Sequence, residues 1–137
     1  MKNILIIFCS LIFFVSCKKS NDTATTPGTD TVPGGTVLAT GNFTSGVHTT
    51  TGTAKVYNDG GTKRLRLENF KTDNGPDLKV YLSKDINAGT FITIGNLRSV
   101  NGNQNYDISG MPDLAEYKYV LIWCQQFGVL FGSALIQ

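Results

Sequence analysis

The chain of 137 residues is 41% hydrophobic and 16% charged, which predicts one small folded domain. A formal net charge of +2, with no basic run longer than Lys18-Lys19, argues against nucleic acid as a partner. The sequence lacks a phosphate-binding glycine loop, a nucleophile elbow, a paired-acid glycosidase pattern and a haem-attachment motif, so it carries no signature of the common hydrolases or transferases.

The first 16 residues are typical of a secretory signal. A short basic start precedes an apolar run from Ile4 to Val15, which is too short to span a membrane as a stable helix. Phe14-Val15-Ser16-Cys17 resembles a bacterial lipobox, in which the signal peptidase cuts before the cysteine and the cysteine carries the lipid. We therefore predict lipidation of Cys17, with an ordinary secreted protein as the alternative. Lys18, in place of Asp after this cysteine, favours sorting to the outer membrane of the cell envelope.

A tether is predicted between the lipidated cysteine and the folded domain. Residues 20–36 are rich in Thr, Pro and Gly and show no apolar period, so we expect residues 17–36 to be disordered. About nineteen residues of flexible coil have a root-mean-square reach of roughly 25 Å. The folded domain is expected to occupy residues 37–137.

Short apolar stretches separated by turns rich in Gly, Asn and Asp fill the rest of the chain. The expected strands are residues 37–43, 53–57, 63–70, 77–83, 91–94, 97–100, 104–108, 119–124 and 129–136, with 47–51 as a further candidate. Hairpin turns are expected at Asn58–Gly61 and at Asn101-Gly102, and a bulge near Asn69 would bring Phe70 inward. Because no window shows a sustained helical period, we predict an all-β fold, an antiparallel β-sandwich of eight or nine short strands.

One face of this sheet is predicted to be wet. Leu65 and Leu67 alternate with Arg64 and Arg66, so the leucines would face the core and the arginines the solvent. Tyr57 falls in the outward register of the preceding strand. These outward residues could bind a sugar or a partner protein, but we expect them simply to face water.

The C-terminal hairpin is predicted to form the core. Both alternating registers of residues 119–124 are apolar, which is typical of a strand buried on both faces. A loop of residues 125–128 would set Cys124 opposite Val129 and Trp123 opposite Leu130. Gly132 would then leave room for the indole ring, and Cys124 would lie in the core or at its rim.

Cysteine content limits the redox chemistry that one chain can perform. Cys9 would leave with the signal and Cys17 would carry lipid, so Cys124 would be alone in the folded domain, with no internal disulfide and no Cys-x-x-Cys pair. A redox cycle would need a second protein or molecule, through sulfenic acid, a mixed disulfide or one-electron transfer. No basic residue adjoins Cys124, so a buried, inert thiol is the alternative.

His48 is the only histidine in the sequence. With Cys124 it could form a nucleophilic pair, but two ligands fall short of the four of a structural zinc site, so we predict no metal site. Asp73, Asn74 and Asp77 superficially resemble a calcium loop, yet their spacing matches no EF-hand. We expect a simple turn there, with Asp77 capping it through bonds to backbone amides.

An ordered set of short motifs runs through the expected domain. They are Gly41-x-Phe43, His48-x-x-x-Gly52, Leu67-x-x-Phe70, Asn74-Gly75-Pro76-Asp77-Leu78-x-Val80-Tyr81-Leu82, Gly95-x-Leu97, Gly102-x-Gln104-x-Tyr106, Tyr117 and Val120-x-Ile122-Trp123-Cys124-x-x-Phe127-x-Val129-x-Phe131-Gly132-x-Ala134. In these residues the chain resembles the DM13 domain, a module named as an electron-transfer domain. The resemblance implies a β-sandwich-like fold and a cysteine with a redox role, which maps onto Cys124.

Three functional hypotheses follow. The first is a lipid-anchored envelope protein with a redox or electron-transfer role through Cys124 and with a redox partner in the envelope. In this hypothesis the surroundings of Cys124 are shaped by Trp123, Phe127 and Phe131. The second is a non-catalytic module that binds or scaffolds a partner at the membrane. The third is a Cys–His hydrolase, which requires Cys124 and His48 to be close together. The sequence identifies no cofactor.

Overall fold

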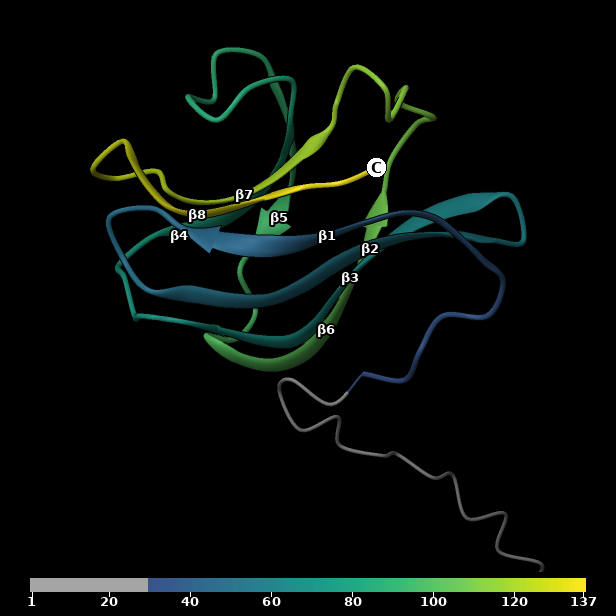
Figure 1. Cartoon of the computed structure of the whole chain (residues 1–137), viewed down its shortest axis with the longest axis horizontal. Coiled ribbons are helices and arrows are strands. Elements are labelled where there is room, and N and C mark those ends of the chain that lie inside the picture. The colour runs from purple at the N-terminus through teal and green to yellow at the C-terminus, as the bar shows by residue number, and fades with distance from the viewer. Residues whose placement is uncertain (1–29) are drawn as a thin grey trace, which may run out of the picture.

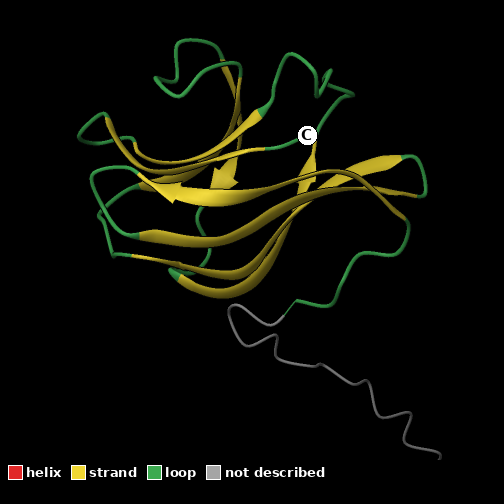
Figure 2. Cartoon of the chain, in the orientation of Figure 1, coloured by secondary structure: helices red, strands yellow, loops and turns green. Residues whose placement is uncertain are grey.

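A computed structural model describes residues 30–137, which contain only strands and loops (Figure 2). The predicted signal peptide and Cys17 lie outside these residues. The strands are β1 (Thr36–Ser45), β2 (Thr50–Asp59), β3 (Thr62–Thr72), β4 (Leu78–Ser83), β5 (Phe91–Asn96), β6 (Asn101–Ile108), β7 (Tyr119–Cys124) and β8 (Val129–Leu135). Within residues 30–137 no helix has the length and apolar character needed to cross a membrane.

The eight strands form one antiparallel sheet in the order β5-β4-β7-β8-β1-β2-β3-β6. The sheet curls until its edge strands β5 and β6 contact each other, which makes it a nearly closed, barrel-like sheet (Figure 1). The predicted all-β class is confirmed, but two separate sandwich sheets are not. The reason is β1, which pairs with β2 over Thr36–Asn42 and with β8 over Phe43–Ser45 and so joins the two halves.

The inside of the curled sheet holds the core. Its fully buried members include Leu65, Leu67 and Phe70 of β3, together with Val80 and Leu82 of β4. The predicted inward register of β3 is therefore confirmed. The bulge is confirmed as well, because Asn69 adopts a φ of 47° and the register against β6 shifts between Leu67 and Phe70.

The hairpin of β7 and β8 has the predicted register next to its loop, with Cys124 opposite Val129 and Trp123 opposite Leu130, but the register then shifts and Ile122 pairs with Gly132. The interpretation of Gly132 is wrong, because the nearest atoms to it belong to Thr50 and not to the indole. A Cβ at position 132 would overlap the Thr50 side chain, whose hydroxyl donates to the Phe131 carbonyl at 2.9 Å. Gly132 thus makes room for a hydrogen bond that crosses the sheet.

Two predicted local elements differ in the structure. Asn101 and Gly102 do not form a hairpin turn but lie inside β6, where Gly102 has a φ of 98° and faces Phe70 at the bulge. Glycine readily adopts the positive φ found in many hairpin turns. Here the positive φ of Gly102 lets β6 pair with the bulged strand β3. Residues 97–100 lie outside the strands, and of the candidate 47–51 only Thr50 and Thr51 belong to one.

The predicted wet face is partly covered. Arg66 is only 3% exposed, because its guanidinium donates to the carbonyls of Asp30 and Thr31 at 2.8 and 3.0 Å. Tyr57 is buried too, so of the three outward residues only Arg64 remains partly exposed. For Arg66 the prediction failed because the end of the expected tether, at residues 30 and 31, packs on this face of the sheet.

Asp30 fixes this segment in place. Its carboxylate accepts hydrogen bonds from Arg98 at 2.9 Å and from the Asn105 amide at 2.8 Å, and its own amide donates to the Asn103 carbonyl. The chain is therefore held against β3 and β6 six residues before β1 begins. The predicted disordered tether does not extend to residue 36.

We expect Gly132→Ala to lower the free energy of unfolding by about 1–3 kcal/mol, because the new methyl group must displace Thr50. Gly95→Ala in β5 is the matched control, since its Cβ would meet nothing closer than Tyr106 at 3.9 Å. Denaturant unfolding of both variants measures the difference. Equal stabilities would contradict the steric role of Gly132.

Candidate functional site

A cavity of about 290 Å³ opens beside Cys124. Its walls come from the β1–β2 loop, the β3–β4 loop and the β7–β8 hairpin, which meet at one end of the sheet (left in Figure 1). The lining residues are His48, Asn74, Gly75, Pro76, Cys124, Phe127, Val129 and Phe131. Chain segments that are far apart in sequence therefore build one small enclosure.

Cys124 is the last residue of β7 and is 1% exposed. Its side chain lies on the core face of the sheet with Val120 and Ile122, as the alternation of the strand requires. It is a free cysteine that also lines the cavity. Cys124 is hence shielded from bulk water but lines a space that a small molecule can enter.

His48 lies at this cavity with one nitrogen engaged. Its Nδ1 is 3.2 Å from Oδ2 of Asp73, and its ring stacks on Phe131 with centroids 3.9 Å apart. Because an ionised carboxylate only accepts hydrogen bonds, Nδ1 carries the hydrogen of a neutral ring, and Nε2 keeps its lone pair. The imidazole is 41% exposed, so one side of the cavity is open to solvent.

Buried hydrogen bonds hold the His48 loop against β8. The amides of Gly46 and Val47 donate to the carbonyls of Phe131 and Leu130 at 2.8 and 3.0 Å. The hydroxyl of Thr50, at the start of β2, donates its one hydrogen to the Phe131 carbonyl. The hydrogen bond of 2.9 Å between the hydroxyls of Thr50 and Thr72 must therefore be donated by Thr72 of β3. These bonds set the positions of both His48 and the residue after Thr72, which is Asp73.

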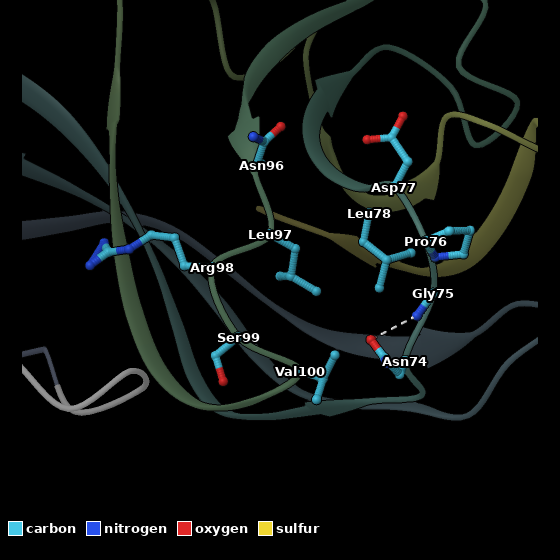
Figure 3. A pocket seen from close by; sticks show the side chains of 10 residues that line it. All are labelled: Asn74, Gly75, Pro76, Asp77, Leu78, Asn96, Leu97, Arg98, Ser99 and Val100. Atoms are coloured by element: carbon cyan, nitrogen blue, oxygen red, sulfur yellow. Dashed lines mark hydrogen bonds between the residues drawn. The ribbon is translucent and has the colours of Figure 1, made fainter.

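The β3–β4 loop closes the cavity from the other side. A Cβ at Gly75 would lie 2.8 Å from Phe131 and 2.9 Å from Leu78, so a larger residue there would displace the ends of these two side chains. Asn74 supports the loop by accepting a hydrogen bond from the Gly75 amide at 3.0 Å (Figure 3).

A second cavity, of about 490 Å³, lies behind the same loop. Figure 3 shows it between Asn74–Leu78 and Asn96–Val100, with Leu78 and Leu97 lying between the two segments and Arg98 pointing away. Residues 74–76 line both cavities and form the wall between them.

Tyr106 anchors the far wall of this second cavity. Its hydroxyl donates to Gln104 at 2.7 Å and accepts from the Arg98 amide at 3.0 Å, while Gln104 bonds both backbone groups of Ser99. Burial raises the pKa of Tyr106 to about 12, against the lowering influence of the Arg98 amide. The 97–100 loop is therefore held by a neutral phenol.

Comparison with known protein families identifies the family of this domain. A family model described as "Electron transfer DM13" matches residues 42–136, which include His48, Asp73 and Cys124. The chain belongs to the DM13 family. No curated protein and no solved structure matches it.

The DM13 domain brings together only some of the predicted site residues. His48, Phe127 and Phe131 share the cavity with Cys124, although the hydrogen bond of His48 goes to Asp73. Trp123 lies on the opposite face of β7 and does not line this cavity. Among the described residues, no cluster of three or more His, Cys, Asp or Glu side chains is arranged to hold a metal ion.

Asp77 lies outside the cysteine cavity and lines the larger one. Its carboxylate pairs with Lys79 at 2.8 Å, and no bond from it to a backbone amide occurs in residues 30–137, so the predicted cap is wrong. Asn74 performs that role instead. Lys79, two residues further along the chain and inside β4, pairs with the carboxylate instead.

The hydrogen bond between His48 and Asp73 of this DM13 domain was not predicted from the sequence. The two residues are 25 positions apart and belong to different loops. In the sequence, Asp73 was noticed only as one oxygen ligand of a superficially calcium-like loop. Pairing it with His48 requires knowing that β2 and β3 are neighbours with Thr50 opposite Thr72.

We expect the stability of the DM13 domain to fall between pH 10 and 12 in a way that depends on Tyr106. The folded pKa, about 12, exceeds the unfolded value of about 10, so only the unfolded chain loses the proton in this range. The stabilisation is complete below pH 10, and about 2–3 kcal/mol of it is lost by pH 12. Denaturant unfolding of the wild type and Tyr106→Phe measures this; parallel curves from pH 8 to 12 would contradict it.

Proposed function

We propose that this chain is an envelope lipoprotein whose DM13 domain performs a redox reaction through Cys124. The observation that carries the proposal is the position of the thiol, which adjoins a cavity of about 290 Å³ instead of being packed on all sides. Membership of a family described as electron-transfer proteins agrees with it. Phe127 and Phe131 line the cavity and keep it largely apolar.

The size of the cavity selects among the redox reactions open to a single thiol. A 1% exposed cysteine is out of reach of a folded protein's disulfide, whereas peroxide, little larger than a water of about 30 Å³, fits easily. We propose that the Cys124 thiolate attacks one oxygen of a hydroperoxide. The S–O bond forms as the O–O bond breaks, sulfur loses two electrons, and the departing oxygen takes a proton to give water or an alcohol.

Regeneration needs a thiol from outside the domain, because no second cysteine lies within residues 30–137. A small thiol would attack the sulfenic sulfur and release water, leaving a mixed disulfide with Cys124. A second thiol would then form a disulfide with the first and return Cys124 to its reduced state. Because a protein thiol would meet the same barrier as a protein disulfide, the expected redox partner is a protein that reduces the small disulfide released in this step.

The alternative function is a non-catalytic binding module at the membrane. The nearly complete burial of Cys124 favours it, since a structural cysteine behaves as a small apolar residue. A Cys–His hydrolase has less support, because the hydrogen bond of His48 goes to Asp73 and not to Cys124.

Attachment to the membrane, and to the outer membrane in particular, is proposed from the lipobox-like residues 14–17 and from Lys18. The chain is fixed to the sheet from Asp30 onward, so thirteen steps separate it from Cys17. The coil predicted for these steps from the sequence would have a root-mean-square reach of roughly 20 Å. The domain would thus stay close to the head groups.

We expect hydrogen peroxide to convert Cys124 to sulfenic acid in the folded state. Treatment of the chain from Lys18 onward, which contains every described residue, with peroxide and a dimedone-type trapping reagent should place one adduct on Cys124. Intact-protein and peptide mass spectrometry measures it, with Cys124→Ser as the control. An adduct that forms only in denaturant would favour the binding module.

We expect Cys17→Ser to abolish lipidation. When the full chain is expressed in a bacterial host that processes lipoproteins, the wild type should partition into the detergent phase and carry acyl chains by mass spectrometry. The variant should lose both properties. Acylation that persists in the variant, or is missing from the wild type, would contradict the anchor.

A further inference from the structure

Three chemically active side chains converge on the cysteine cavity from separate elements. His48 comes from the β1–β2 loop, Asp73 from the β3–β4 loop, and Cys124 from the end of β7. His48 and Cys124 line the cavity directly, and Asp73 touches it through the 3.2 Å bond to His48. Among the described residues no hydrogen bond joins Cys124 to His48, so a proton relay of thiol, imidazole and carboxylate requires a bridging molecule between the first two groups.

The hydrogen bond and the stacking contact together fix how the imidazole is presented. Asp73 accepts from Nδ1, which leaves Nε2 as the basic atom. The Phe131 ring, 3.9 Å away and inclined by 25°, covers one face of the imidazole and limits its rotation. His48 is thus held in one tautomer and one plane beside the cavity.

We propose that His48, oriented by Asp73, is the base that accepts the Cys124 proton and that Asp73 is a positioning residue for this reaction. The inference deepens the proposed redox function and rests on it. A water molecule in the cavity takes the thiol proton and passes one of its own to Nε2. The products are a thiolate and an imidazolium, and the Asp73 carboxylate stabilises the positive charge.

The same imidazolium supplies the proton that the oxidation needs. When the thiolate breaks the O–O bond of a hydroperoxide, the departing oxygen carries the negative charge. Return of the proton from Nε2 through water neutralises it, so His48 ends the step as it began. One group serves as base and then as acid, and no proton is gained or lost overall.

Few other charges surround His48. On the β3–β4 loop the only charged residues are Asp73 and Asp77, and Asp77 is paired with Lys79 of β4. The rest of the β1–β2 loop, the β7–β8 loop and β8 carry no charged side chain. The pH response of the cavity is therefore assigned to Cys124, His48 and Asp73.

The test is the pH dependence of Cys124 alkylation by iodoacetamide in the chain from Lys18 onward, measured from pH 5 to 10. We expect His48→Gln to slow alkylation at pH 7 by about tenfold or more and to move the midpoint of the rate to higher pH. Asp73→Asn can still accept from Nδ1 but cannot stabilise the imidazolium by charge. It should shift the midpoint in the same direction by a smaller amount.

Asp107→Asn is the matched control, because its carboxylate is 72% exposed, pairs with Arg64 and lies away from the cavity. It should leave the profile unchanged. The side chains of His48 and Asp73 are 41% and 55% exposed, so both variants are expected to fold, and cooperative unfolding of each checks this.

The outcomes separate this inference from the proposed function. Wild-type labelling in the folded state, with profiles shifted in both variants and unchanged in the control, supports the relay. Folded-state labelling with identical profiles in all four proteins overturns the relay and leaves the redox function standing. Labelling of the wild type only after unfolding overturns both.

Discussion

The structure depends on one buried hydroxyl, that of Thr50. It donates to the Phe131 carbonyl of β8 and accepts from Thr72 of β3, so it joins strands on both sides of the bend in the sheet. In an environment without water the hydroxyls of Thr50 and Thr72 would otherwise be left unpaired, at a cost of about 1–3 kcal/mol. Gly132 exists at its position because nothing larger leaves room for this hydroxyl.

The cavity is a consequence of this constraint. The Thr50 bonds fix Phe131, whose ring supports His48 and meets the Gly75 loop. They also set the end of β3, and with it Asp73. The start of β2 and the end of β3, which adjoin two of the walls around Cys124, are therefore fixed by Thr50 and Thr72, and neither of these residues lines the cavity.

Structural features that depend on residues close together in the sequence could be predicted. The inward register of Leu65 and Leu67, the bulge at Asn69 and the pairing of Cys124 with Val129 all follow from strict alternation and from the loop length. Features that need long-range pairing could not. The sheet curls because β1 pairs with both β2 and β8. The sequence Asn101-Gly102 is typical of a turn, but here it lies in a strand opposite the bulge in β3.

The burial of Arg66 belongs to the same class of features. Alternation places it outward, and it does point outward, but carbonyls of residues 30 and 31 cover it. The candidate site divides in the same way. Cys124 at the rim of the core followed from hairpin geometry, whereas the bond between His48 and Asp73 depends on which strands become neighbours.

The clamp on Asp30 has a mechanical consequence. A pull on the N-terminal end of the chain would first load the hydrogen bonds of Asp30 and Thr31 with Arg66, Arg98 and Asn105. These contacts transfer the tension to β3 and β6. The strand that leads into the His48 loop, β1, lies beyond the clamp and bears none of this tension until the clamp opens. The His48 loop is thereby shielded from a force applied before residue 30, whereas β3, which leads into Asp73, carries the load.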